Sequence, residues 1–349
     1  MKLTTIGIDL AKSVFQVHGV DERGKAVLRK QVKRKDVLAY FANLEPCLIG
    51  MEACGSAHHW ARKLSELGHT VKLMAPQFVK PYVKANKTDA ADAEAICEAV
   101  ARPNMRFVPV KNAEQQAILA VHRVRSGLVA ERTAQLNRLR GLLAEFGLIA
   151  PRGRRALMER LPLLLADETL PGVARTLFER QSTRIRQLDA EIAAEEAVIL
   201  AWHRTNELSK RLDAVAGVGP ITATALVASF GEGREFDNGR QMAACLGLVP
   251  RQHSSGGRTK MLGISKRGDN YLRMLLVHGA RAVIRTLERR AKNGSNPTDQ
   301  WLTRLLARRN PNVAAVALAN KTVRVIWALL AHGRIYDRNW SSQRAAVVA

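Results

Sequence analysis

The chain has 349 residues, of which 47% are hydrophobic and 25% are charged. This composition is typical of a globular protein with two or three domains and excludes an extended disordered chain. The formal net charge is +24, and the segment 211–349 alone carries 22 basic and 8 acidic side chains. Because a strongly basic surface attracts polyanions, the charge favours a nucleic-acid-binding protein.

The sequence also bears on the cellular compartment. No apolar run approaches the roughly 18–20 residues of a membrane-spanning helix, and the opening MKLTTIGIDLAKS has no apolar leader segment. The cysteines show no CxxC pair and no disulfide-like spacing; they are Cys47, Cys54, Cys97 and Cys245. We therefore expect a soluble cytoplasmic protein with reduced thiols, no zinc site and no membrane partner.

Residues 1–110 alternate strand and helix signals. The runs TTIGIDL and VFQVHGV are rich in β-branched residues, AVLRKQVK follows after a turn, and linkers this short predict an antiparallel meander. Further strands are expected in CLIGMEA and TVKLMAP, and helices in KDVLAYFANL, SAHHWARKLSELG and TDAADAEAICEAVAR. This element order predicts an α/β domain of the RNase H-like (RuvC-like) class.

Residues 111–205 carry helical patterns. One apolar stripe includes Val121, Val124 and Leu128 and continues from Leu136 to Phe146 at spacings of three or four. A second stripe runs from Leu177 through Ile185 to Ile199. The two stripes predict a helical hairpin that links the flanking domains. Packing of the helices within one chain and self-association as a coiled coil are both compatible with this pattern.

Residues 206–349 show further helical patterns and little strand signal, so we predict a mostly α-helical C-terminal domain. It begins with LDAVAGVGPITATALVASFG, in which Gly217 and Gly219 resemble the turn of a helix-hairpin-helix element. Glycines allow close backbone approach, and the N–H groups that open the next helix can bind a phosphate. An ordinary glycine-rich turn is the alternative.

Four acidic residues stand at positions that suit metal binding. Asp9 and Glu52 each end an apolar strand, and Asp89 and Asp92 lie three apart on a predicted helix, where both project from one face. Clustered carboxylates repel one another unless a cation lies between them. Magnesium prefers such oxygen ligands and can stabilise both oxygens of a phosphoryl displacement. Turn, surface and helix-end roles are the alternatives for the individual residues.

A basic segment lies at residues 246–273, LGLVPRQHSSGGRTKMLGISKRGDNYLR. Its small-residue centre, SSGG at 254–257, is surrounded by Arg251, His253, Arg258, Lys260, Lys266, Arg267 and Arg273. Cationic groups bind phosphates and stabilise a negatively charged transition state. A serine among them could attack phosphorus and form a covalent protein–DNA link. A solvated DNA-contact loop without catalysis is the other interpretation.

These motifs resemble those of insertion-sequence transposases of the one-ten family, in its eleven-eleven branch, the RNA-bridged recombinases. The resemblance covers nearly the whole chain through IGIDLAKSVFQVHGVD, IGMEACGSAHHWAR, KTDAADAEAI, AGVGPITATALVA and GLVPRQHSSGGRTKMLGISKRGDNYLRMLLVHGARA. It implies three domains: a RuvC-like catalytic domain (1–110), a coiled-coil linker (111–205) and a C-terminal transposase domain (206–349).

The same resemblance implies a mechanism. It assigns Mg²⁺ to Asp9, Glu52, Asp89 and Asp92, and a catalytic serine to a Pro-x-x-x-x-Ser-Gly context, which counted from Pro250 is Ser255 rather than Ser254. It also implies donor and target DNA, a structured guide RNA, a homo-oligomer (dimer or tetramer) and action on the nucleoid of a prokaryote.

Two other functions fit parts of the sequence. A structure-specific junction nuclease would use the same four acids with water as the nucleophile, and would not need the 246–273 segment. A non-catalytic nucleic-acid-binding regulator would need the positive charge but none of the acids.

Overall fold

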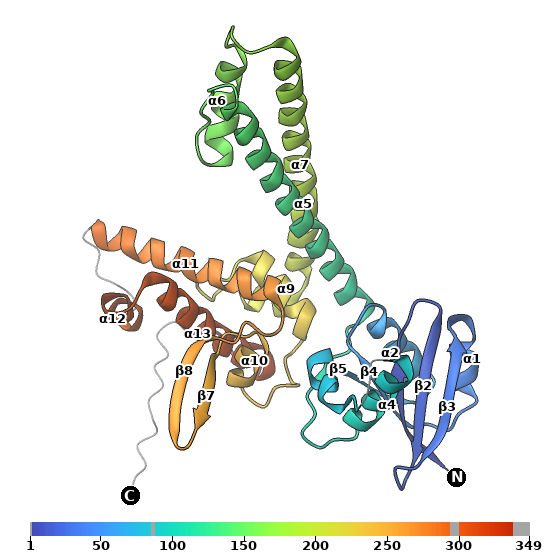
Figure 1. Cartoon of the computed structure of the whole chain (residues 1–349). Coiled ribbons are helices and arrows are strands. Elements are labelled where there is room, and N and C mark those ends of the chain that lie inside the picture. Colours follow the sequence, from blue (N-terminus) through green and yellow to red (C-terminus); the bar gives the residue numbers. More distant parts are fainter. Residues whose placement is uncertain (1, 85–87, 294–299, 338–349) are drawn as a thin grey trace, which may run out of the picture. The chain divides into compact units, whose positions relative to one another are not determined.

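The computed structural model describes residues 2–84, 88–293 and 300–337, and the chain forms two compact units, Met1–Gln116 and Ala117–Ala349 (Figure 1). The first unit is a mixed α/β structure, and the second is mainly helical. The boundary between the units falls within the long helix α5 (Ala113–Ala144).

A six-stranded sheet forms the centre of the first unit, with the order β3-β2-β1-β4-β5-β6. The predicted meander is confirmed, because β1 pairs antiparallel with β2 and β2 with β3. Strand β4 then lies parallel to β1, and β5 parallel to β4. The strands are β1 (Leu3–Asp9), β2 (Val14–Asp21), β3 (Ala26–Lys33), β4 (Leu48–Glu52), β5 (Thr70–Met74) and the short antiparallel β6 (Phe107–Val108).

Helices cover both faces of this sheet. On one face α1 (Val37–Ala42) and α2 (Ala57–Glu66) enclose a core with Ile6, Ile8 and Trp60. On the other face α4 (Asp89–Val100) packs directly on β1, and the short α3 (Pro76–Val79) contacts α4. Helix α4 begins where it was predicted to begin, since the Thr88 hydroxyl accepts a hydrogen bond from the Ala91 N–H (3.2 Å).

The predicted helical hairpin is present at the start of the second unit. Helices α5 and α7 (Gly172–Thr205) pack together with α6 (Arg154–Leu165) around Leu139, Leu157 and Phe178. Ion pairs join α5 to α7 along their length: Arg125 to Glu196, Arg132 to Asp189 and Arg184 to Glu131. Not every residue of the predicted apolar stripe is buried, since Val124 is 51% exposed.

The rest of the second unit is a helical core with one β-hairpin. Its helices are α8 (Glu207–Arg211), α9 (Pro220–Phe230), α10 (Gly239–Cys245), α11 (Asn270–Lys292), α12 (Gln300–Arg308) and α13 (Pro311–Ala331). The expectation of little strand here is corrected by the antiparallel pair β7 (Pro250–Ser255) and β8 (Arg258–Ile264). The hairpin lacks the alternation of apolar residues that marks a strand, because β7 is exposed on both faces.

Helix α13 corrects a second expectation. It is long and apolar enough to cross a membrane by length and composition alone. However, it packs in the main hydrophobic core of this unit through Ala315, Val323 and Ile326, and half of its most apolar window is buried there. Buried helices of globular proteins have the same composition.

A buried histidine connects three helices of the second unit. His122 on α5 is 1% exposed, and its Nδ1 and Nε2 lie 2.9 Å from the Tyr271 hydroxyl and 3.0 Å from the Thr224 hydroxyl. Because the Thr224 hydroxyl donates its own hydrogen to the Pro220 carbonyl (2.7 Å), His122 carries its proton on Nε2 and accepts at Nδ1. Burial and the nearby Arg125 charge lower the pKa of His122 to about 4, so the ring is neutral.

This histidine predicts a pH dependence of stability. Below pH 6.5 the unfolded chain protonates His122, whereas the folded chain does so only near its pKa of about 4. As the pH is lowered between these values, this residue should reduce the free energy of unfolding by about 1.4 kcal/mol per pH unit. We expect His122→Gln to lack this contribution when urea unfolding is compared at about pH 5 and about pH 7. Equal pH dependence in both proteins would contradict the prediction.

Candidate active site: an acidic sheet face and a serine hairpin

Asp9 and Glu52 lie next to each other at the ends of neighbouring parallel strands. The register pairs Ile8 with Met51, so the next residue of each strand is an acid. Both side chains are half-buried. Because side chains alternate along a strand, Asp9 shares a face with Gly7, and Glu52 with Gly50. The sequence prediction that these two acids meet is therefore supported by the strand pairing.

The charges of both acids reach a nearby thiol. The pKa of Cys54 is raised, first by burial and then by the negative charges of Glu52 and Asp9. The thiol and both carboxylates therefore lie close together at these strand ends. The carboxylate oxygens are ligands that suit a hard cation such as Mg²⁺.

Helix α4 brings Asp89 and Asp92 to the same face of the sheet. A side chain at Gly7 would place its Cβ 2.2 Å from the Ala93 carbonyl oxygen, so the helix backbone lies directly on β1. A Cβ at Gly50 would likewise lie 2.7 Å from Val100. The first turn of α4, which carries the two acids, comes immediately before the residue that contacts Gly7. Asp92 is half-buried and Asp89 is exposed.

The four acids share this face, but they do not form a finished metal site. Within residues 2–84, 88–293 and 300–337, no group of three or more His, Cys, Asp or Glu side chains is arranged to hold a metal ion. Carboxylates repel one another, so a cation would be needed to hold all four together. The all-oxygen donor set fits a hard divalent cation.

Two glutamines on the same face were not predicted. The register pairs Asp9 with Gln16 on β2, and Gln16 with Gln31 on β3. Facing residues of paired strands point to the same side of a sheet, so a row of polar side chains runs from Glu52 through Asp9 to the edge strand. In the sequence, the alternation of polar and apolar residues around Gln16 and Gln31 was the one indication that these side chains share a face.

Ser255 and Ser254 lie on opposite faces of the β7–β8 hairpin. Ser255 pairs with Arg258 and His253 with Lys260, so one face carries the Ser255 hydroxyl beside these three potential cations. Ser254 pairs with Thr259 on the other face, where its hydroxyl accepts a hydrogen bond from Gln252 Nε2 (2.6 Å). All of these residues are exposed.

The turn between the strands is built from two glycines. Gly256 and Gly257 both have positive φ, +53° and +76°. A two-residue turn with this backbone matches the twist of a hairpin, and glycine adopts it without strain. The small-residue segment 254–257 is therefore not a loop throughout. Ser254 and Ser255 are the last residues of β7, and Gly256 and Gly257 form the turn.

Other predicted phosphate ligands lie at the base of the hairpin. Arg251 is exposed on β7, and Lys266 and Arg267 are exposed just after β8. Arg273 differs, because it is only 8% exposed and donates hydrogen bonds to the carbonyls of Leu246 (3.0 Å) and Arg267 (2.9 Å). Its guanidinium holds the ends of the 246–267 segment together, so this placement does not support the predicted direct phosphate contact.

The two glycines of the predicted helix-hairpin-helix turn have different environments. Gly217 has φ +82° and packs backbone to backbone against Gly279 of α11, since a Cβ at Gly217 would lie 2.8 Å from the Gly279 carbonyl oxygen. Gly219 is the N-cap residue of α9, is exposed, and has open space around its Cβ position. Gly279 was not singled out in the sequence, where one glycine within a helical pattern gives no sign of such a contact.

Comparison with known proteins places these residues in a family. A family model described as "Transposase", of the DEDD type of IS110, matches residues 6–147, and a second, described as "Transposase IS116/IS110/IS902 family", matches residues 209–294. A curated relative from Pseudomonas aeruginosa, named "Probable family 20 transposase", is 56% identical over 96% of this chain and 99% of its own.

The chain belongs to the IS110/IS116/IS902 family of transposases. Two other relatives support the IS1111 branch. The transposase for insertion sequence element IS1111A of Coxiella burnetii is 45% identical over 95% of this chain and 90% of its own. The transposase for element IS1328 of Yersinia enterocolitica is 41% identical over 96% of this chain and 99% of its own.

As a member of this family the protein is an enzyme that cuts and rejoins DNA during transposition of an insertion sequence. The first family match contains all four acids, and the second contains Ser255 together with both glycines of the 217–219 turn. The two groups of candidate residues therefore fall within the two segments that match the family models.

The two turn glycines provide a matched pair of substitutions. Gly217→Ala introduces a Cβ at positive φ against a main-chain oxygen and should lower the free energy of unfolding by about 2 kcal/mol or more. Gly219→Ala meets open space and should change it by less than about 0.5 kcal/mol. Chemical denaturation of both variants measures the difference. Equal effects would mean that the Gly217–Gly279 contact does not constrain the turn.

Proposed function

We propose that this transposase cuts and rejoins DNA through a covalent link between DNA and Ser255. The observation that carries the proposal is the hairpin face on which Ser255 stands beside His253, Arg258 and Lys260. Cations beside the hydroxyl can bind the scissile phosphate and stabilise the charge that develops during attack. Ser254 lies on the opposite face, away from these cations, and its hydroxyl is hydrogen-bonded to Gln252. It is therefore less suited than Ser255 to attack a bound phosphate.

The reaction would proceed by two exchanges at phosphorus. In the first, a bond forms between Ser255 Oγ and phosphorus while the bond from phosphorus to one strand oxygen breaks; the hydroxyl releases its proton, and the leaving oxygen takes one up. In the second, the free end of another strand attacks the same phosphorus and releases Ser255. Because the phosphoester is conserved in each exchange, strands can be rejoined without an external energy source.

The four acids form the second part of the proposed site. Asp9, Glu52, Asp89 and Asp92 would hold Mg²⁺, which supplies charge stabilisation to the phosphate oxygens. Two features support this assignment: all four acids share one face of the sheet, and the strand order with β1 central and β2 antiparallel is that expected of an RNase H-like domain. The row of Gln16 and Gln31 beside Asp9 would contact the DNA backbone.

Nucleic-acid contacts outside the two sites follow from charge and backbone geometry. Arg251, Lys266 and Arg267 are exposed near the base of the serine hairpin and would bind phosphates of DNA or RNA. The exposed start of α9 at Gly219 would add a phosphate contact of the helix-hairpin-helix kind. We further propose that a structured guide RNA selects the donor and target DNA, and that the protein acts on the nucleoid in the cytoplasm.

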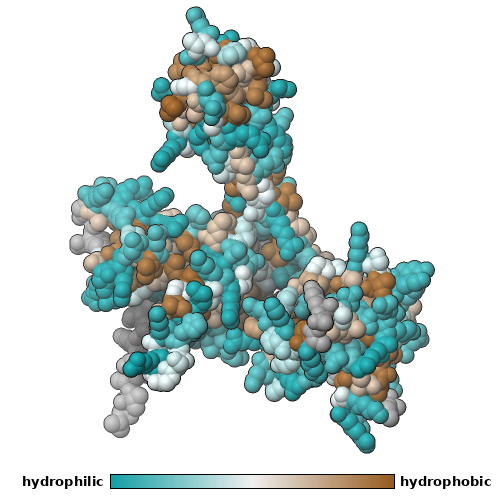
Figure 2. Space-filling view, viewed as in Figure 1, coloured by the Kyte–Doolittle hydropathy of each residue, from teal (hydrophilic) through white to brown (hydrophobic). Residues whose placement is uncertain are grey.

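A homo-oligomer, either a dimer or a tetramer, completes the proposal. Apolar side chains gather at the tip of the α5–α7 hairpin (Figure 2), where Ile149, Leu163 and Val173 are 74%, 75% and 86% exposed. An exposed apolar patch of this kind favours association with another protein surface. Self-association of the helical hairpin as a coiled coil would let the acids of one subunit act together with Ser255 of another.

The covalent step is tested by two neighbouring substitutions. With labelled DNA and Mg²⁺, we expect Ser255→Ala to form no protein–DNA adduct that survives denaturing electrophoresis, because the attacking oxygen is removed. Ser254→Ala should form the adduct at a rate within about threefold of the wild type. An adduct in Ser255→Ala would exclude this serine as the nucleophile. If the wild type and Ser255→Ala both cleave DNA and neither forms an adduct, the result would instead favour a nuclease that uses water.

The acids are tested in a DNA recombination assay with the same protein. Asp9→Asn and Asp92→Asn should each lower the rate in Mg²⁺ by at least about 100-fold, because one metal ligand and one charge are lost. The matched control is Glu98→Gln, also on α4, where Glu98 pairs with Arg102; its rate should stay within about twofold. Chelation of the metal should abolish the reaction. Unchanged rates in both aspartate variants would exclude these acids as metal ligands in the reaction.

A further inference from the structure

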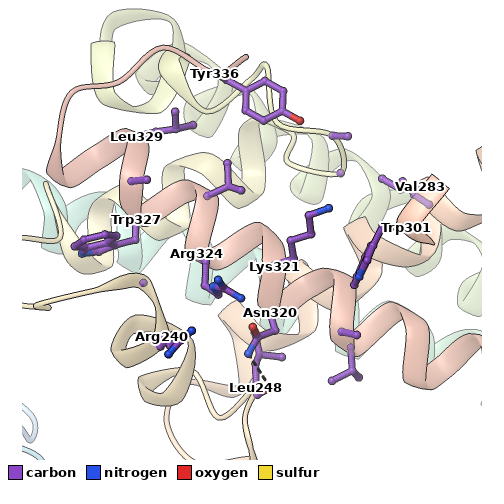
Figure 3. Close-up of a pocket in the computed structure, with 18 of the residues that line it drawn as sticks. Arg240, Leu248, Val283, Trp301, Asn320, Lys321, Arg324, Trp327, Leu329 and Tyr336 are labelled. Carbon is purple, nitrogen blue, oxygen red and sulfur yellow. Dashed lines mark hydrogen bonds between the residues drawn. The ribbon is translucent and has the colours of Figure 1, made fainter. Parts of the chain in front are cut away.

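A large hollow lies in the second unit at the base of the serine hairpin. Its volume is about 2160 Å³, and its walls come from α10, α11, α12, α13 and the segment that follows α13 (Figure 3). Pro250 of β7 and Leu262 and Ile264 of β8 also line it, so the hollow adjoins the hairpin that carries Ser255. The hollow plays no part in the serine chemistry described above.

Helix α13 divides the core from the hollow. One of its faces, with Ala315, Val323 and Ile326, is buried in the core. Its other face lines the hollow with Asn320, Lys321 and Arg324 and also with apolar side chains such as Val316 and Val325. The wall formed by this helix is therefore part polar and part apolar, and it is not lined for a purely apolar ligand.

The lining of the hollow carries an excess of positive charge. Among the described residues that line it, Arg240, Arg290, Lys321, Arg324 and Arg334 are basic, whereas Asp337 is acidic. Arg240 and Arg324 appear together in Figure 3, and Gly239 packs on the Arg324 main chain, since a Cβ there would lie 2.8 Å from the Arg324 Cα. Two guanidinium groups carried on adjoining main-chain segments can both contribute hydrogen bonds to a phosphate.

Flat and hydrogen-bonding groups stand beside these cations. The Trp301 ring is 39% exposed and has Lys321 Nζ 4.4 Å from its centroid. The Asn320 amide donates from Nδ2 to the Leu248 carbonyl (3.2 Å), which fixes the amide while its oxygen stays available as an acceptor. The Trp327 indole is held in the same way by a hydrogen bond to the Phe236 carbonyl (3.1 Å).

We propose that this hollow binds a single-stranded segment of nucleic acid. Phosphates would lie on Arg240 and Arg324, and an unstacked base would lie against Trp301, with Asn320 as a hydrogen-bond acceptor for a base amino group. Stacking on an aromatic ring together with cations along the backbone is how proteins bind unpaired nucleotides. A duplex lacks exposed base faces and would gain only the phosphate contacts.

The hollow and Ser255 lie at opposite ends of strand β7. A six-residue strand such as β7 is roughly 20 Å long, which corresponds to roughly three to six nucleotides of one strand. The hollow would therefore hold a strand a few nucleotides away from the phosphate that Ser255 attacks. Such a contact would keep a displaced or unpaired strand in place during exchange.

The test compares a charge-reversed hollow with an equally charge-reversed control. The test variant is Arg240→Glu with Arg324→Glu. The control is Arg285→Glu with Arg304→Glu, two exposed cations of the same unit that do not line the hollow. Binding of a labelled single-stranded oligonucleotide, and of the matching duplex, is measured by fluorescence anisotropy at several salt concentrations, with the full-length chain.

We expect the test variant to lose about 30-fold or more in single-strand affinity, with the salt dependence reduced by roughly 1.4 in slope for two lost phosphate contacts. The control should lose at most about threefold. Trp301→Leu, which removes the ring and no charge, should weaken single-strand binding by about 5-fold or more and leave duplex binding unchanged. Anisotropy reports binding alone, so the result stays decisive for the hollow whether or not Ser255 forms the proposed covalent link.

Three results would overturn the proposal. The first is equal loss of affinity in the test variant and the control. The second is loss of duplex binding in Trp301→Leu as large as the loss of single-strand binding. The third is a change of oligomeric state in the test variant, seen by sedimentation, with single-strand affinity unchanged, because the hollow would then be a contact between subunits. If the double variant does not fold, the single variants Trp301→Leu and Lys321→Gln test the proposal instead, and each should lower the affinity for the single-stranded oligonucleotide.

Discussion

The close contact between α4 and β1 is the constraint on which the acidic face depends. Gly7 has no side chain, so the main chain of the helix at Ala93 and Cys97 lies directly against the strand. A Cβ at Gly7 would lie 2.2 Å from the Ala93 carbonyl oxygen, closer than non-bonded atoms approach, so any larger residue would push the helix away from the strand. Asp89 and Asp92 would then move away from the face that carries Asp9 and Glu52, although none of the four acids had changed.

The second unit uses the same kind of contact for a different purpose. Gly217 and Gly279 pack main chain against main chain, and this joins the turn before α9 to the middle of α11. Arg273, one turn into α11, ties down the 246–267 segment through two main-chain carbonyls. Together these contacts give the exposed serine hairpin a rigid base, which is what a nucleophile on a surface strand needs in order to meet a phosphate in a fixed geometry.

The transposase thus keeps its two kinds of chemical group on separate scaffolds. The acids lie on a sheet and a helix of the first unit, where strand ends and a helix end would supply the oxygen ligands of the proposed metal site. The serine and its cations lie on a hairpin of the second unit, where alternation of side chains places the hydroxyl beside the positive charges. In the proposed mechanism, assembly with nucleic acid would control when the two groups act together.

The sequence by itself determined much of this. Strand and helix order in residues 1–110 could be predicted because apolar runs and caps are local signals, and the family could be recognised from motifs that include all four acids and Ser255. It could not distinguish Arg273 from the other cations of the 246–273 segment, because burial depends on contacts between distant residues. Nor could it show the β7–β8 hairpin, whose exposed strands lack apolar alternation, or the Gly217–Gly279 contact. Only the tertiary structure decided those points, and only strand register put Ser255 and Ser254 on opposite faces, since one residue of register reverses the direction of every side chain.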